Sequence, residues 1–365
     1  MTRVRFGLVG CGKIGKRHAE RIQQNRDAEL VGVYDIVPAR AELFAETYKC
    51  QRFNTYEDLL RAEFDVVNIC TPSGLHASMS LEALKAGKHV LCEKPMTTCL
   101  ADADEVMQAE KASGKRFFLV KQNRFNPPVR ALKECVLDGR LGNVLFMGCS
   151  VFWNRTRQYY VEDDWRGTMA LDGGSLMTQC SHFLDLMVWI GGAVRTVSSQ
   201  MNNLAHSYIE TEDTGVVSLE FKNGAQGLLQ YTTAAYKENL EGSLTVLGSS
   251  GTIKVGGQYL NTLAHWSVEG YEAPVLEKGA EPNDYGTYKG SMSNHDKVID
   301  NVIRVLNGLE QIATNSAQGR ESIEVMQAAY ISALSDRKVV LPLVGDDYSF
   351  RIGEHPPLSG NRKAK

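Results

Sequence analysis

The chain has 365 residues, a length that suits about two domains rather than a single core. Hydrophobic residues make up 43% and charged residues 23%, as in globular proteins, and a net charge of −3 gives no electrostatic reason to expect nucleic acid or an anionic membrane as a partner. We find no membrane-spanning apolar run, signal-peptide pattern or zinc-binding cysteine spacing, so we expect a cytoplasmic protein with eight reduced cysteines and no metal site.

Strands and helices alternate along the first third of the chain. Apolar runs predict strands at 4–9, 30–34, 66–70, 90–92 and 117–120, and helical patterns lie between them at 14–24, from 38, at 75–86 and at 100–113. Apolar strands separated by helices indicate a parallel, doubly wound sheet that is buried on both faces. We therefore predict an α/β Rossmann domain over residues 1–124.

From residue 125 onward, alternation of apolar and polar residues dominates. This pattern predicts strands at 144–153, 194–202, 214–221, 226–232, 243–247 and 252–255. Helices are expected at 127–137, 177–189, 295–308 and 322–336, followed by a strand at 339–343. We predict an α+β domain with a mostly antiparallel open sheet over 125–343, which binds substrate and forms oligomer contacts, and a polar, weakly ordered tail over 344–365.

A glycine-rich turn follows the first strand and opens the first helix. Gly10 permits the tight turn, Gly12 lets the backbone approach a pyrophosphate, and Gly15 lets helix and strand pack closely. Asp35, 20 residues beyond Gly15, can accept hydrogen bonds from the adenosine ribose hydroxyls. The residues directly after Asp35 supply no cation for a 2′-phosphate, although Arg40 could reach that region, so NAD is favoured over NADP. The expected cofactor contacts here are Gly10, Gly12, Lys13, Ile14, Gly15 and Asp35.

Two further segments follow predicted parallel strands at their carboxyl ends, where doubly wound sheets bind ligands. Thr71 and Pro72 follow the third strand, and they also suit a simple strand-to-helix turn. Lys94 follows the fourth strand and is expected to point into the same crevice, although an isolated lysine is more often solvated. From these segments we expect cofactor contacts by Thr71, Pro72, His76, Glu93, Lys94 and Gln122.

These motifs together resemble one oxidoreductase family. GCGKIGKRH at 10–18, the acid at 35, TPSGLH at 71–76, AGKHVLCEKPM at 86–96 and GGSLMTQCSHFLDLMVWIGG at 173–192 are similar to the glucose–fructose oxidoreductase / inositol dehydrogenase (Gfo/Idh/MocA) family, over nearly the whole chain. The resemblance implies that Lys94 contacts the substrate hydroxyl near the nicotinamide and that His182 is the general base. Asp185, three residues after His182, is either its hydrogen-bond partner or a structural acid.

A second resemblance concerns the substrate. Many inositol dehydrogenase-like members carry an acid four residues before the histidine, where this chain has Thr178. The loop that follows residue 153 is dense in arginines and aromatic rings, which bind phosphate, carboxylate and sugar faces unless the loop packs against a neighbouring subunit. These segments resemble UDP-N-acetylglucosaminuronate 3-dehydrogenases. The expected substrate contacts are Lys94, Arg155, Tyr159, Trp165, Arg166, Thr178, Gln179, His182 and His295, the last of which also suits a helix start.

The resemblance to this branch implies a reaction and partners. It implies oxidation of the C3 hydroxyl of a UDP-sugar to a 3-keto sugar, for the diamino sugars of lipopolysaccharide and O-antigen. Some members of the branch reoxidise their NADH with 2-oxoglutarate, and the family pattern of assembly leads us to expect a homotetramer. Two alternatives remain: an inositol or free-sugar dehydrogenase of the same family, and a non-catalytic NAD(H)-binding sensor or subunit.

Overall fold

The computed structural model describes residues 1–358 and divides the chain into two compact units. The first, here called the Rossmann unit, comprises Met1–Thr97, Ala101–Gln122 and Asn294–Arg320. The second, here called the sheet unit, comprises Thr98–Leu100, Asn123–Ser293 and the chain from Glu321 onward. This division differs from the expected boundaries at residues 294–320, because helix α10 (His295–Leu306) packs against α1 (Lys13–Gln24).

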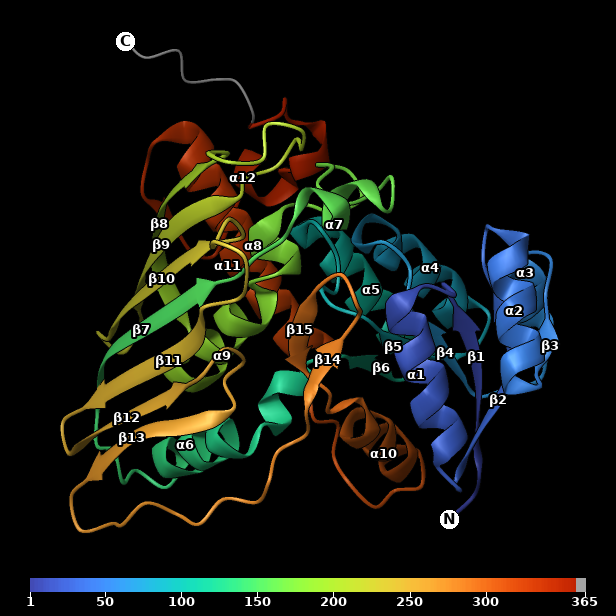
Figure 1. The fold of residues 1–365 in the computed structure, drawn as a ribbon, viewed down its shortest axis with the longest axis horizontal. Coiled ribbons are helices and arrows are strands. Elements are labelled where there is room, and N and C mark those ends of the chain that lie inside the picture. Colours follow the sequence, from blue (N-terminus) through green and yellow to red (C-terminus); the bar gives the residue numbers. More distant parts are fainter. Residues whose placement is uncertain (359–365) are drawn as a thin grey trace. The chain divides into compact units, whose positions relative to one another are not determined.

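The Rossmann unit is built on a six-stranded parallel sheet in the order β3-β2-β1-β4-β5-β6 (Figure 1). The order in which successive strands are added reverses between β1 and β4, and this switch point is where such sheets bind ligands. The strands are β1(Val4–Val9), β2(Ala28–Tyr34), β3(Gln51–Arg52), β4(Val66–Ile69), β5(His89–Cys92) and β6(Phe117–Leu119). The other helical segments are α2(Pro38–Tyr48), α3(Tyr56–Arg61), η1(Ser73–Leu75), α4(His76–Lys85) and α5(Leu100–Ser113).

Burial explains why this sheet was predictable. All four residues of β4 are buried, as are all but one residue of β1, so both strands are covered on both faces. Strand β3 and helix α3 escaped prediction because β3 has two exposed residues and α3 is only six residues long. The predicted α/β Rossmann class is confirmed.

The sheet unit contains an eight-stranded sheet in the order β13-β12-β11-β7-β10-β9-β8-β16. Neighbouring strands are antiparallel except for the β7–β10 pair, which is parallel, so the predicted mostly antiparallel sheet is confirmed. The strands are β7(Val144–Phe152), β8(Val194–Asn202), β9(Thr214–Phe221), β10(Gln226–Thr232), β11(Glu241–Gly248), β12(Gly251–Gly256), β13(Thr262–Val268) and β16(Val339–Val340).

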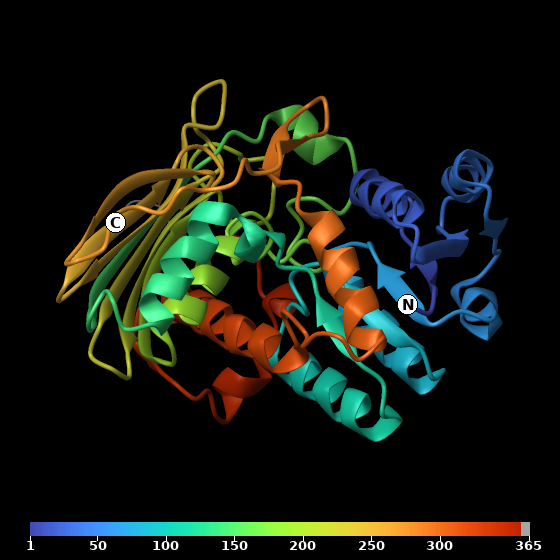
Figure 2. The ribbon, with the colours of Figure 1, turned by 90° about the horizontal axis from the view of Figure 1, so that it is seen from below.

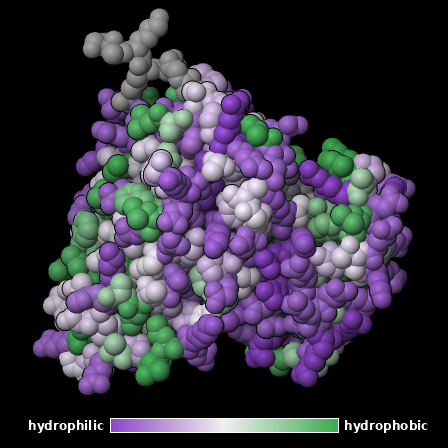
Figure 3. Space-filling view, in the orientation of Figure 1, coloured by the Kyte–Doolittle hydropathy of each residue, from purple (hydrophilic) through white to green (hydrophobic). Residues whose placement is uncertain are grey.

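Helices cover only one face of this sheet (Figures 1 and 2). They are α6(Pro127–Leu137), α9(Ser181–Gly191) and the part of α11(Ser316–Ser335) that belongs to the sheet unit. The opposite face exposes Val216 and Val340. Apolar patches lie among polar side chains over these strands in Figure 3.

Three parts of the sheet unit differ from expectation. The helix expected at 177–189 is two helices, α8(Ser175–Thr178) and α9, because the chain turns at Gln179 and Cys180. The hairpin β14(Pro282–Asp284)–β15(Lys289–Met292), α7(Arg157–Val161) and η2(Gln122–Phe125) at its start were not predicted. The expectation of a weakly ordered tail is wrong for residues 345–358, which contain α12(Asp346–Ser349), η3(Ile352–Glu354) and a buried Ile352. Its last part, 359–365, lies outside the described residues.

Two absences hold for the described part of the chain. No helix within residues 1–358 is long and apolar enough to cross a membrane. All eight cysteines fall in this range, and each is a free thiol.

Candidate active site

The glycine turn between β1 and α1 leaves space where a dinucleotide needs it. Gly10 has a φ of +93°, and a Cβ there would lie 2.5 Å from the Cys70 carbonyl oxygen. A Cβ at Gly15 would overlap the Gly10 carbonyl oxygen, so these two positions are glycine for packing reasons. A Cβ at Gly12, by contrast, would meet nothing within 4 Å. The turn therefore has open space at the N-terminus of α1, where a pyrophosphate binds.

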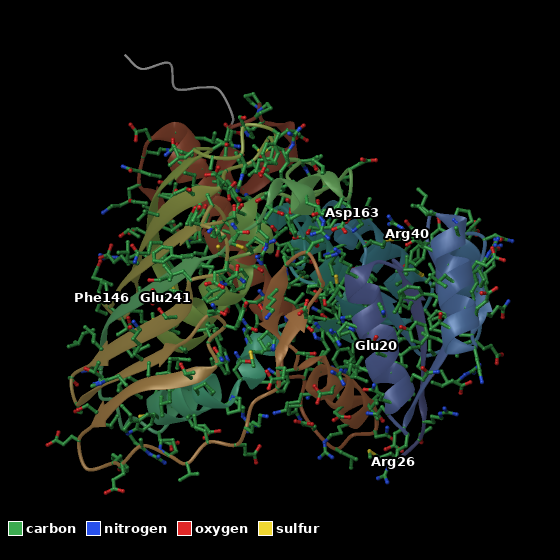
Figure 4. The ribbon with its side chains drawn as sticks, viewed as in Figure 1. Glu20, Arg26, Arg40, Phe146, Asp163 and Glu241 are labelled. Carbon is green, nitrogen blue, oxygen red and sulfur yellow. The ribbon has the colours of Figure 1, made fainter. Side chains whose placement is uncertain are left out.

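Asp35 lies beside this turn at the end of β2. Its Oδ2 accepts a 2.7 Å hydrogen bond from the Cys11 N–H, and its Oδ1 accepts a 2.8 Å bond from the Val37 N–H. Each carboxylate oxygen has a second lone pair, so the fixed carboxylate can still accept ribose hydroxyls. Burial, together with the Asp35 charge, raises the pKa of the Cys11 thiol, which therefore stays neutral. Arg40, the cation in question for a 2′-phosphate, lies on α2 (Figure 4).

The segment after β4 contains one residue that suits a ligand and one that does not. The Thr71 hydroxyl is buried and has no hydrogen-bond partner among the described residues, which fits an expected cofactor contact. His76 is buried, and its Nδ1 and Nε2 lie 2.7 and 2.9 Å from the backbone oxygens of Pro95 and Thr71. Burial lowers the pKa of His76. Both ring nitrogens thus face backbone oxygens of these two loops, and the cofactor contact expected of His76 stays a prediction.

Glu93 lies in a buried cluster with two histidines. Its Oε1 is 2.8 Å from His18 Nε2 and 3.6 Å from His295 Nε2, and the two imidazole rings meet edge to face. Burial alone would raise the pKa of the Glu93 carboxyl, but His18 and His295 hold it well below its usual range. Such a trio also has the composition of a metal site, but a hydrogen bond accounts for its shortest distance.

This cluster also surrounds His295, which the sequence predicts as a substrate contact. We expected it to contact the substrate, yet its side chain is fully buried within the Rossmann unit. The reason is that α10, which starts at His295, packs against α1, the helix that carries His18. The Glu93 carboxylate likewise faces His18 and His295, and the ligand contacts expected of Glu93 and His295 stay predictions.

Lys94 follows directly and is held by its neighbour. Its backbone N–H donates a 3.1 Å hydrogen bond to Glu93 Oε2, and its side chain is half-buried. Gln122, the first residue of η2, is buried and its Oε1 has no partner within residues 1–358. Both residues therefore remain candidates for ligand contact. Within the Rossmann unit, the open turn, Asp35, Thr71 and Gln122 fit an NAD molecule.

In the sheet unit, His182 lies near the start of α9 and is buried. Asp185, on the same helix, accepts two hydrogen bonds from Arg124, at 2.8 and 2.9 Å, and a third from the Ser322 hydroxyl at 3.0 Å. These bonds favour the structural alternative for Asp185 over pairing with His182. The expected base therefore sits on a helix that a buried ion pair holds in place.

The residues before His182 have internal partners. The Thr178 hydroxyl donates to the Gly174 carbonyl at 2.9 Å, so it does not replace the acid found there in many inositol dehydrogenases. Gln179 accepts from Arg155 Nε at 2.9 Å and donates to the Tyr159 hydroxyl at 2.8 Å. Gln179 thus connects the segment that carries His182 to the arginine and aromatic loop.

That loop forms a compact cluster of rings and guanidinium groups. The Arg155 guanidinium lies 5.5 Å from the Tyr159 ring centre, and that of Arg166 lies 4.2 Å from the same centre and 5.0 Å from that of Trp165. Asp163, labelled in Figure 4, pairs with Arg166 at 3.0 Å. Sequence reasoning did predict these four aromatic and basic residues, and the structure brings them together.

The sequence patterns did not identify two residues of these clusters, Tyr288 and His18. Tyr288, on the loop of the β14–β15 hairpin, stacks edge to face on Tyr159 with ring centres 4.8 Å apart. No motif marks Tyr288, because it lies more than a hundred residues from its partners. His18 does fall inside the GCGKIGKRH motif, and its place on the first helix could have suggested a buried role.

Known proteins match the chain along most of its length. Residues 4–121 match the model of an oxidoreductase family with an NAD-binding Rossmann fold, and residues 129–254 match a GFO/IDH/MocA C-terminal domain. The WlbA dehydrogenase from Bordetella pertussis, solved with NADH and UDP-GlcNAcA, is 35% identical with a TM-score of 0.86, covering 94% of this chain and 99% of that one.

Two further relatives are similar over almost their whole length. The WlbA dehydrogenase from Chromobacterium violaceum, also solved with NADH and UDP-GlcNAcA, is 37% identical with a TM-score of 0.85, covering 94% of this chain and 98% of that one. Inositol 2-dehydrogenase from Rhizobium meliloti is 27% identical over 346 residues, 92% of this chain and 98% of the relative. The chain is an NAD-dependent oxidoreductase, and it belongs to the GFO/IDH/MocA family.

Proposed function

We propose that the protein oxidises the C3 hydroxyl of UDP-N-acetylglucosaminuronate (UDP-GlcNAcA) to a 3-keto sugar. The observation that carries this proposal is the similarity to two WlbA dehydrogenases solved with this sugar nucleotide, at 35% and 37% identity over nearly complete chains. The cluster of Arg155, Tyr159 and Arg166 supports it, because guanidinium groups bind anionic substituents and rings bind sugar faces.

Two side chains are proposed to handle the substrate hydroxyl. NAD⁺, when bound, supplies the acceptor for the hydride that leaves the sugar carbon. Lys94 orients the hydroxyl and stabilises the negative charge that develops on its oxygen. His182 takes the hydroxyl proton as the C–H bond breaks, because imidazole titrates near neutral pH. Glu93 fixes the backbone of Lys94 through its 3.1 Å hydrogen bond and acts as a positioning residue.

A second candidate is an inositol or free-sugar dehydrogenase. The similarity to an inositol 2-dehydrogenase over 92% of this chain favours it. Thr178 opposes it, because this position lacks a carboxylate and its hydroxyl is engaged with Gly174. Inositol and free sugars lack the uridine diphosphate of UDP-GlcNAcA, so activity with each substrate separates the two candidates.

Three parts of the proposal concern the wider role. We place the reaction in the synthesis of diamino sugars for lipopolysaccharide and O-antigen, and we take 2-oxoglutarate as a candidate acceptor that returns NADH to NAD⁺ on the enzyme. The open sheet face, with Val216 and Val340 exposed, suits burial against other copies in a homotetramer. Sedimentation equilibrium tests the assembly, and a monomer would contradict it.

The test of the activity uses the purified protein as isolated. UDP-GlcNAcA and NAD⁺ are added with and without 2-oxoglutarate, NADH is followed by absorbance, and the sugar is followed by mass spectrometry. We expect a product two mass units lighter, in keeping with the loss of two hydrogens, and its absence in Lys94→Ala. Turnover of myo-inositol but not of UDP-GlcNAcA would replace the first candidate by the second.

A further inference from the structure

Arg155 is a fully buried cation in the sheet unit whose hydrogen bonds all go to neutral oxygens. Its side chain is 1% exposed. The Nε donates to Gln179 Oε1 at 2.9 Å, and Nη1 donates to the Asn154 carbonyl at 2.7 Å and to Asn239 Oδ1 at 3.3 Å. Within the described chain Nη2 donates no hydrogen bond, so one end of the guanidinium keeps its donors for another molecule.

Aromatic rings make up the rest of its surroundings. The Arg155 guanidinium lies 5.0 Å from the ring centres of Trp153 and Tyr288, and 5.5 Å from that of Tyr159. Cation–π attraction partly compensates the loss of water, but rings carry no net charge. The positive charge of Arg155 is therefore enclosed without being neutralised.

Two other arginines of this unit, with side chains 6% and 7% exposed, are neutralised within the protein. Arg124 forms a two-point ion pair with Asp185, and Arg166 pairs with Asp163 at 3.0 Å. Among the described residues, Arg155 has no carboxylate within ion-pair distance. A buried charge without a counter-charge is strongly unfavourable, so the missing partner is expected to be an anionic group of a ligand.

We propose that Arg155 binds the carboxylate of the sugar ring and thereby selects a uronate over the corresponding neutral sugar. This inference rests on the proposed function. A carboxylate carries one negative charge and neutralises one guanidinium, whereas a diphosphate would leave excess negative charge among the aromatic rings. Gln179, which binds Arg155 Nε, also lies three residues before His182, the proposed base. The anion therefore belongs on the sugar that carries the reacting hydroxyl.

The experiment measures binding of UDP-GlcNAcA, UDP-GlcNAc and UDP to the NADH-loaded protein by titration calorimetry. Wild type is expected to prefer UDP-GlcNAcA over UDP-GlcNAc by at least about thirtyfold, the effect of removing one partner of a buried charge pair. Arg155→Gln should abolish this preference while changing the affinity for UDP less than about threefold. Arg155→Lys keeps the charge and should retain part of the preference.

Each of the following results would overturn the proposal that Arg155 binds the sugar carboxylate. A wild type that binds the uronate and the neutral sugar equally contradicts it, even if Arg155→Gln does not fold. If Arg155→Gln lost affinity for UDP as much as for UDP-GlcNAcA, Arg155 would be assigned to the diphosphate. If Arg155→Gln kept the wild-type preference for UDP-GlcNAcA, the carboxylate would be assigned to another residue. If neither UDP-sugar nor UDP binds, the proposed function itself has failed. NADH affinity and the melting temperature of each variant show whether the fold is intact.

Discussion

Glu212 is expected to make the stability of the sheet unit depend on pH. It is fully buried, and its Oε1 accepts hydrogen bonds from the Leu176 N–H at 2.7 Å and from the hydroxyls of Tyr330 and Tyr231 at 2.8 and 3.2 Å. Its Oε2 has no partner among the described residues. Burial raises the pKa of Glu212 from 4.5 to about 7, because the charged form loses more hydration than these hydrogen bonds replace.

Proton linkage gives the sign and the size of the pH effect of Glu212 on the free energy of unfolding. The folded protein holds the Glu212 proton more tightly than the unfolded chain does, so protonation of Glu212 stabilises the fold. This stabilisation is complete below about pH 4.5 and is lost as the pH rises through about 7. The shift of about 2.5 units corresponds to about 3 kcal/mol. Between about pH 5 and pH 8, Glu212 alone should lower the free energy of unfolding by about 2.5 kcal/mol.

Urea unfolding of wild type and Glu212→Gln over this pH range isolates the effect. Glutamine keeps an acceptor for the Leu176 N–H but cannot ionise, so the difference in unfolding free energy between the two proteins should change by about 2.5 kcal/mol across the range. Glu277→Gln, at an exposed position, is the matched control and should give a constant difference. Parallel curves for wild type and Glu212→Gln would refute the reasoning.

The remaining predictions concern catalysis, the glycine turn and the ion pair between Arg124 and Asp185. Lys94→Ala should lower kcat by about a hundredfold or more while changing NADH affinity little, and a rate within threefold of wild type would contradict its role. Gly12→Ala should have the melting temperature of wild type but bind NADH poorly, because only the cofactor needs the space beside Gly12. Gly15→Ala should lower the melting temperature, because its Cβ would overlap the Gly10 carbonyl oxygen. The same melting temperature and NADH affinity in both variants would refute this distinction. Asp185→Asn should lower the free energy of unfolding, measured in urea, by about 3 kcal/mol, because Arg124 stays buried without its counter-charge. A loss below about 0.5 kcal/mol would show that the ion pair does not stabilise the fold.

The parts of the fold that sequence predicts are those with a local pattern. Strand β9 alternates buried and exposed positions along its length, and its predicted bounds match the structure. Helix α10 also has a clear apolar face, and its start was placed correctly. Its partner was not, because an amphipathic pattern says that a face is buried but not against which element. Residues 294–320 were therefore assigned to the wrong neighbour.

The candidate site divides in the same way. Gly10, Gly12, Gly15 and Asp35 were found because their spacing within one strand–turn–helix segment is itself the signal. The buried surroundings of His295 were not predictable, because its neighbours come from segments more than two hundred residues away. A histidine at a helix start looks the same in sequence whether it faces a ligand or a buried carboxylate.

Ionic partners decide which basic residues are available to a substrate. In sequence, Arg124, Arg155 and Arg166 look alike, since each lies beside or close to aromatic residues, and only the last two were predicted to contact substrate. The folded chain brings a carboxylate to two of them, and these acids offset the charge whether or not a ligand is present. For Arg155 the fold supplies amide oxygens and rings instead, so neutralising its charge requires an anion from outside the protein. Arg124 and Arg166 are thus neutralised before any ligand binds, whereas Arg155 is the one of these three whose charge requires a ligand anion. The acid partners, not the arginines, carry the distinction.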